Sequence, residues 1–121
     1  MNYIVKKNNM ISMIRGDSFR HIFEFEIGKF PRKKKLSINE DDLIYFGVMY
    51  PNEHFEHCII KKEFTKDDLT SEGDLIVTLN PEDTVWLNPG TYYYEIRMLH
   101  QSSEDVYLKT LIQKTKFTIL D

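Results

Sequence analysis

"EGDLIVTLNPEDTVWLNPGTYYYEIRM", residues 72–98, is the stretch of this sequence that decides the fold. In its first part Leu75, Val77 and Leu79 are separated by single residues, which is the period of a strand with one buried face. The same period returns after a turn at Pro89 and Gly90, in Tyr92, Tyr94, Ile96 and Met98. The stretch therefore predicts two strands and a short connection between them.

The connection, residues 80–87, has the residue types that begin a helix. Asn80 suits a helix N-cap, Pro81 suits the first helical position, and two acidic residues follow. These residues predict one short helical turn near 81–87. Trp86 comes directly before the Leu-Asn-Pro-Gly corner, and we expect it to plug one end of the fold.

Similar patterns recur on both sides of this stretch. Residues 19–27 alternate, with Phe19, Phe23, Phe25 and Ile27 on one face. Residues 43–51, "LIYFGVMYP", are nearly all apolar, as in a central strand covered on both faces, and residues 54–64 predict its hairpin partner. Residues 28–42 predict a long exposed loop, and residues 106–120 predict one long strand or two short ones.

This order of elements predicts an all-β protein. About seven strands with turns at fairly regular spacing and no crossover helix favour an antiparallel β-sandwich, with a small barrel as the competing architecture. A chain of 121 residues is long enough for one core and too short for two, so we expect residues 1–121 to form a single domain.

The composition narrows the classes of partner and compartment. The net charge of −3 and the sequence pI of about 5.8 favour neither a nucleic acid nor an anionic membrane as partner. Cys58 is the one cysteine, so the fold is held by its core and suits a reducing compartment. The sequence shows neither a signal peptide nor an apolar run long enough to span a membrane, which predicts a location in the cytoplasm or in a particle assembled there.

Possible metal ligands gather in "NEHFEHC", residues 52–58. His54, His57 and Cys58 are the candidates, because imidazole and thiolate bind zinc and similar ions. On a strand, however, positions 54 and 57 point to opposite faces, and structural zinc sites draw ligands from two separate elements. We therefore predict no metal site and no cofactor, and interpret the segment as a polar hairpin end.

The sequence carries no recognisable catalytic or phosphate-binding motif, so we expect no enzyme activity. The basic run "PRKKK" includes Lys33 and Lys34, and these side chains are candidates for contact with an acidic patch on a protein partner. Tyr93 lies on the opposite strand face from Tyr92 and Tyr94, next to Arg97 on that face. Tyr93 and Arg97 are thus further candidates for a protein or sugar contact.

Arg15-Gly16-Asp17 is the tripeptide that some adhesion proteins display to receptors. Here it stands between the short apolar stretches "MISMI" and "SFRHIF", which leave room only for a tight link. Gly16 tolerates an unusual φ at such a bend, and Asp17 bonds nearby backbone amides. We therefore predict a structural turn at Gly16 and Asp17, with a second one at Pro89 and Gly90.

Several of these motifs, taken in order, carry a resemblance to a known family. They are Gly16-Asp17 at the first long strand, residues 73–79, and then Leu87, Gly90, Tyr92, Tyr94, Glu95 and Ile96. In this order the chain resembles the immunoglobulin-like sandwich domains of phage tail and baseplate structural proteins, notably the N-terminal domain of the baseplate upper protein family. The resemblance implies an immunoglobulin-like β-sandwich, found in the virion.

The same resemblance implies a function. We expect a non-enzymatic structural or assembly module of a phage or prophage tail or baseplate, which self-associates or docks on other virion proteins. The alternative is a module that binds glycans or a surface receptor. Its platform would be aromatic: Tyr93, Phe30, Phe55 and Trp86.

Overall fold

The computed structural model describes residues 3–6, 8–27 and 34–121, and the protein is all-β, as predicted. The strands of this part are β1 (Tyr3–Val5), β2 (Ile11–Ile14), β3 (Phe19–Phe23), β4 (Glu26–Ile27), β5 (Lys34–Lys35), β6 (Leu43–Met49), β7 (Ile60–Phe64), β8 (Leu75–Leu79), β9 (Gly90–Gln101) and β10 (Val106–Leu120). Short helical turns are η1 (Phe55–His57), η2 (Lys66–Asp68) and α1 (Pro81–Thr84).

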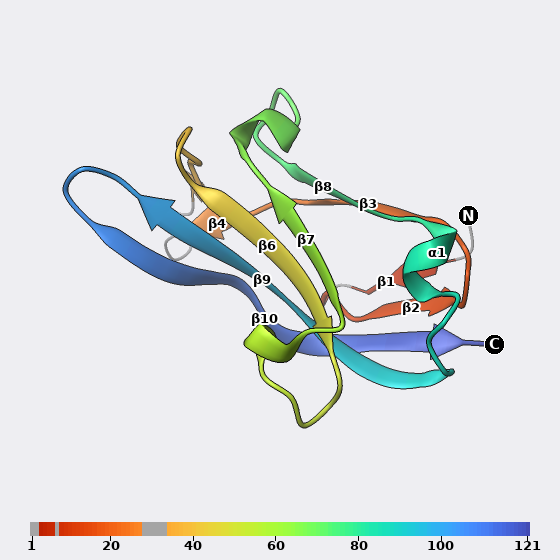
Figure 1. Cartoon of the computed structure of the whole chain (residues 1–121). Helices are drawn as coiled ribbons and strands as arrows, with labels where there is room; N and C mark the ends of the chain where they lie inside the picture. Colours follow the sequence, from red (N-terminus) through yellow and green to blue (C-terminus); the bar gives the residue numbers. More distant parts are fainter. Residues whose placement is uncertain (1–2, 7, 28–33) are drawn as a thin grey trace.

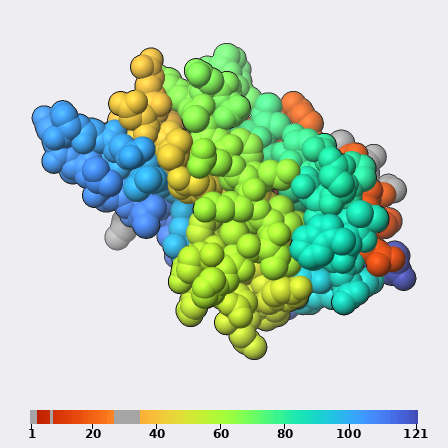
Figure 2. Space-filling model, viewed as in Figure 1, coloured from red at the N-terminus to blue at the C-terminus, as the bar shows by residue number. Residues whose placement is uncertain are grey.

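One curled sheet of six strands forms the body, in the order β1-β2-β10-β9-β6-β7 (Figure 1). All its neighbours are antiparallel except β2 and β10, which run parallel. A second sheet pairs β3 with β8, and β4 with β5 form a short ladder. The β9–β10 hairpin is the longest feature, and its end projects beyond the body (Figures 1 and 2).

The core lies between the six-stranded sheet and the β3–β8 pair. The ring of Phe23 on β3 lies 6.2 Å from the ring of Tyr94 on β9, and the ring of Tyr94 lies 5.4 Å from that of Phe46 on β6. Other buried apolar residues of this cluster are Ile11, Met13, Phe19, Ile44, Val48, Leu75, Val77, Leu79, Ile96, Phe117 and Ile119. Each such side chain stabilises the fold by about 1.5–3 kcal/mol relative to exposure.

In the central stretch both predicted strands form, whereas the helical turn predicted near 81–87 is shorter, because α1 ends at Thr84. Leu75, Val77 and Leu79 point into the core from β8. The helical turn α1 follows with Asn80 as N-cap, and the Asn80 amide donates to Asp83 Oδ2 at 2.8 Å. Such a capping box satisfies amides that a helix start leaves without partners.

Three expectations about residues 19–64 need correction. The predicted strand 19–27 is divided into β3 and β4, which pair in different sheets. Residues 55–57 form the turn η1 rather than strand, and β7 begins only at Ile60. The segment before β6 is not simply an exposed loop, because Ile38 and Asp42 are buried. Asp42 accepts hydrogen bonds from the amides of Asn39 and Gln101, which accounts for a buried carboxylate there. Residues 28–33 lie outside the described part.

Candidate interaction surfaces

The Arg15-Gly16-Asp17 segment is a tight turn held by the fold. Gly16 has φ +80°, and its amide donates to the buried Thr84 Oγ1 of α1 at 2.9 Å. The Asp17 amide closes the turn on the carbonyl of Ile14, and Arg15 pairs with Asp121 at 3.0 Å. This agrees with the predicted structural turn at Gly16.

The outer face of the six-stranded sheet, opposite the core, is partly covered by the loop 50–59. Phe55 of η1 is buried against Gly47 of β6, where a side chain on Gly47 would meet its ring. Lys114 of β10 fastens the loop, because its Nζ donates to the carbonyls of Pro51 and Glu53 at 2.8 and 3.0 Å. Because Phe55 is buried, its ring is not available to the aromatic platform expected for glycan or receptor binding.

Tyr93 and Arg97 lie under the edge of this loop, both only partly exposed. The Arg97 guanidinium stacks on the Phe55 ring at 4.5 Å, and Arg97 Nε pairs with Glu95 Oε2 at 2.9 Å. The Lys114 ammonium lies 5.4 Å from the centre of the Tyr93 ring. Both predicted contact residues thus have partners within the chain.

His54, His57 and Cys58 do not form a metal site in this fold. No group of three or more histidine, cysteine, aspartate or glutamate side chains in the described residues is placed to hold a metal ion. His57 Nδ1 lies 3.2 Å from Glu53 Oε2, whereas the Cys58 thiol points toward Gly47. Burial raises the pKa of Cys58, which makes it a poor nucleophile at neutral pH.

The remaining predicted residues are the two lysines of the basic run and the two residues before β9. Lys33 lies outside the described residues, and Lys34 is placed only by its backbone, which pairs with Ile27 across β4 and β5. Pro89 lies at a bend directly before β9, and Gly90, with φ +151°, is already the first residue of that strand, so a bend stands where the turn was predicted. The corner is tied by Tyr92, whose hydroxyl donates to the carbonyl of Asn88 at 2.7 Å.

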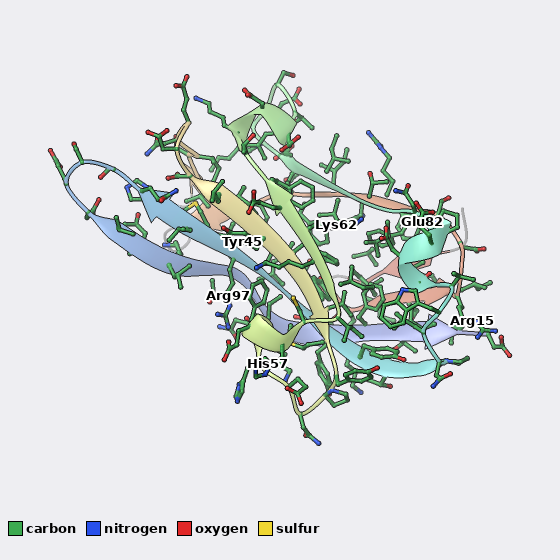
Figure 3. The ribbon with its side chains drawn as sticks, in the orientation of Figure 1. Arg15, Tyr45, His57, Lys62, Glu82 and Arg97 are labelled. Atoms are coloured by element: carbon green, nitrogen blue, oxygen red, sulfur yellow. The ribbon has the colours of Figure 1, made fainter. Side chains whose placement is uncertain are left out.

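Trp86 does not plug the fold, contrary to expectation. Its side chain is 55% exposed, and the next residue, Leu87, is buried in its place. Trp86 lines a groove of about 180 Å³ between β7 and α1, where Lys62 pairs with Asp83 at 2.9 Å. Lys62 and Glu82, both lining this groove, are labelled in Figure 3.

The end of the β9–β10 hairpin exposes apolar side chains that the sequence analysis did not single out. Val106 is 66% exposed and Leu108 is 63% exposed. Leu108 lies opposite Leu99 of β9, which in turn lies opposite Leu43 of β6, so these three leucines form one row across the outer face. The alternation in "VYLKT" was visible in the sequence, but only the strand pairing shows that this first part of β10 lies at a sheet edge.

The inner side of the same hairpin is anchored to the body. His100 is nearly buried, with Nδ1 2.9 Å from Asp42 Oδ1 and Nε2 3.3 Å from Asp105 Oδ1. The Tyr107 ring stacks on the His100 ring at 4.7 Å. These contacts hold the hairpin end in a fixed position, so it can bind a partner with little loss of conformational freedom.

Comparison with known protein families and with curated proteins finds no match. Among the described residues, no helix has the length and apolar character needed to cross a membrane.

Proposed function

We propose that the protein is a non-enzymatic assembly module that works through protein–protein contacts. The observation that carries this proposal is the projecting β9–β10 hairpin, whose end exposes Val106 and Leu108 while His100 anchors it. Large apolar side chains exposed together on an anchored element are typical of interaction sites. An edge strand with unpaired backbone groups offers a template for pairing with another chain.

We further propose that the architecture is an immunoglobulin-like sandwich. In that fold strands C, F and G are neighbours in one sheet and B pairs with E in the other. Here β6, β9 and β10 are neighbours, and β3 pairs with β8. The hydroxyl of Tyr92 bonds the backbone four residues upstream near the start of β9, which is the arrangement of a tyrosine corner at the start of strand F.

The biological setting that we propose is a phage or prophage tail or baseplate. Its support is the resemblance of the motifs between Gly16 and Ile96 to baseplate domains, together with a strand order compatible with an immunoglobulin-like sandwich. The test is to induce and purify particles from the producing bacterium and to probe them with an antibody against this chain. The proposal predicts a stoichiometric band that sediments with the particles, and its absence from particles would contradict the setting.

Glycan binding is the second candidate function, and the exposure of Trp86 favours it. An exposed indole beside a groove with charged walls is suited to stack on a sugar ring. Because Trp86 is the one tryptophan, its fluorescence reports directly on this groove. Binding predicts a spectral shift and protection from acrylamide when oligosaccharides are added, and an unchanged spectrum across a broad oligosaccharide panel would remove this candidate.

A further inference from the structure

The first part of β10 is an unpaired sheet edge. β2 pairs with β10 only from Phe117 to Leu120, and no other described strand pairs with β10 on the side away from β9. The regular part of this edge runs from Val106 to Thr110, because the register with β9 shifts after Thr110. All five of these residues are exposed. The edge is thus short, regular and accessible to one further strand.

The charges along this edge have opposite signs at its two ends. Asp105 precedes the strand with its side chain 58% exposed, whereas Lys109 lies four residues later. Beyond Lys109, the rest of β10 contains Lys114 and Lys116 and no acidic residue. An antiparallel copy of the same segment would therefore meet this edge with complementary charges.

A two-fold axis perpendicular to the sheet restricts the possible registers. It places each residue opposite one on the same face of the sheet, so paired residues are an even number of positions apart. When the axis passes through Tyr107, Asp105 lies opposite the Lys109 of the second copy, and Val106 lies opposite its Leu108. When the axis passes through Lys109, the two Lys109 side chains oppose each other. The first register matches both charge and apolar character.

The geometry points to a second copy of this chain as the occupant of the β10 edge, paired antiparallel about Tyr107. The resulting continuous sheet would run β9-β10-β10-β9 through the dimer, with Val106 and Leu108 of both copies forming an apolar row on its outer face. This inference rests on the proposed function, because it assigns a surface to self-association, which is one of the two kinds of contact expected of an assembly module.

Cysteine crosslinking tests the register. Tyr107→Cys in a Cys58→Ser background places the new thiols on the two-fold axis, where paired strands have Cα atoms about 4.5–5.5 Å apart, within the range of a disulfide. Mild oxidation should move this variant from the monomer band to the dimer band on a non-reducing gel. Gln113→Cys in the same background is the matched control, since it is exposed on the same strand but far from its copy, and it should stay monomeric.

Charge reversal tests the same register in solution without a new thiol. Asp105→Lys alone and Lys109→Glu alone each create two like-charge pairs, and we expect each to weaken dimerisation by about tenfold or more. Asp105→Lys also removes the pair with His100, so Asp105→Asn, which removes that pair without adding a like charge, is its control and should weaken dimerisation less. The double variant Asp105→Lys/Lys109→Glu restores opposite charges and should recover the dimer. Circular dichroism of each variant confirms that it is folded.

The outcomes separate this inference from the proposed function. Crosslinking at position 107 with rescue by the double variant supports the inference. An oligomer that both single variants leave unchanged, or that crosslinks through position 113 instead, would overturn the edge assignment while leaving the assembly function in place. A wild-type chain that is monomeric at every concentration, together with a Tyr107→Cys variant that forms no crosslink, would overturn the inference as well as its self-association premise.

Discussion

At the scale of single residues, the strand ends are held by a few specific contacts. Gly16 adopts a left-handed φ so that its amide reaches Thr84, and Tyr92 closes the corner before β9. The identities of these residues follow from local geometry, because a left-handed bend favours glycine and a buried hydroxyl needs an acceptor. Arg15 is different, since its contact with Asp121 lies at the surface.

The first prediction separates a turn from an adhesion motif. Gly16→Ala should lower the free energy of unfolding by about 1–2 kcal/mol, because alanine is strained at φ +80°. Arg15→Ala should change it by no more than about 0.5 kcal/mol, since an exposed ion pair contributes little. Urea unfolding of both variants measures the difference. Equal tolerance of both changes would reopen the receptor-binding interpretation.

The second prediction concerns pH and His21. Burial beside Phe23, whose ring lies 4.7 Å away, lowers the pKa of His21 below its ordinary value of 6.5. As the pH falls through about 6.5, the unfolded chain therefore binds a proton at His21 before the folded chain does, and stability decreases. Above that pH this residue contributes no pH dependence.

The measurement is the free energy of unfolding between pH 7.5 and pH 5. His21→Gln should flatten the acid-side loss relative to the wild type. His54→Gln is the control, because His54 is exposed and forms no ion pair in the described part of the chain, and we expect its slope to stay close to that of the wild type. An identical slope in the wild type and His21→Gln would contradict the account.

At the scale of elements, alternation and turn residues predicted most of the fold. β3, β8, β9 and α1 were evident because each has one buried face or a clear cap. The strands β1, β4 and β5 were not evident, because a strand of two or three residues is too short to show an alternation of apolar and polar residues. Residues 54–57 were assigned to a strand because nothing local shows that Phe55 turns back onto Gly47.

The candidate sites were harder to predict than the elements. Tyr93 and Arg97 were correctly placed on the face opposite the core, but the loop that covers them comes from a distant part of the chain. Trp86 and Leu87 are adjacent, and only the packed structure shows which one is buried. Val106 and Leu108 look like ordinary strand residues until the strand order leaves their edge unpaired.

The third prediction tests how the loop 50–59 is seated. A Cβ on Gly47 would lie 2.8 Å from Phe55 Cε1 and 3.2 Å from Cys58 Sγ, so Gly47→Ala displaces the loop at a cost of about 1–3 kcal/mol. The Cys58 thiol should then react faster with iodoacetamide. In the Phe55→Leu background the same change should cost less, and strict additivity of the two changes would contradict this packing.

The fourth prediction addresses the corner before β9. Tyr92→Phe keeps the buried ring but removes the hydroxyl that bonds Asn88, and it should lower the free energy of unfolding by about 0.5–1.5 kcal/mol. Tyr50→Phe is the matched control, because Tyr50 packs beside Tyr92 but is 46% exposed. The urea unfolding midpoints of the two variants measure this difference. An unchanged midpoint for Tyr92→Phe would show that the hydroxyl does not stabilise the corner before β9.

At the scale of the whole molecule, the stable part and the interacting part are separate. Two sheets enclose one core, and the exposed side chains of Val106, Leu108 and Trp86 lie outside it. The hairpin end is nevertheless fixed, since His100 bridges Asp42 and Asp105. A surface held in this way loses little conformational freedom on binding, which suits repeated assembly contacts.

The central claim is that this chain self-associates, and light scattering coupled to size-exclusion chromatography tests it most directly. Over a wide concentration range, the account predicts a mass that rises from that of the 14.5 kDa chain to twice that value. Lys109→Glu should shift this rise to higher concentration. A constant mass of one chain at every concentration would contradict the account.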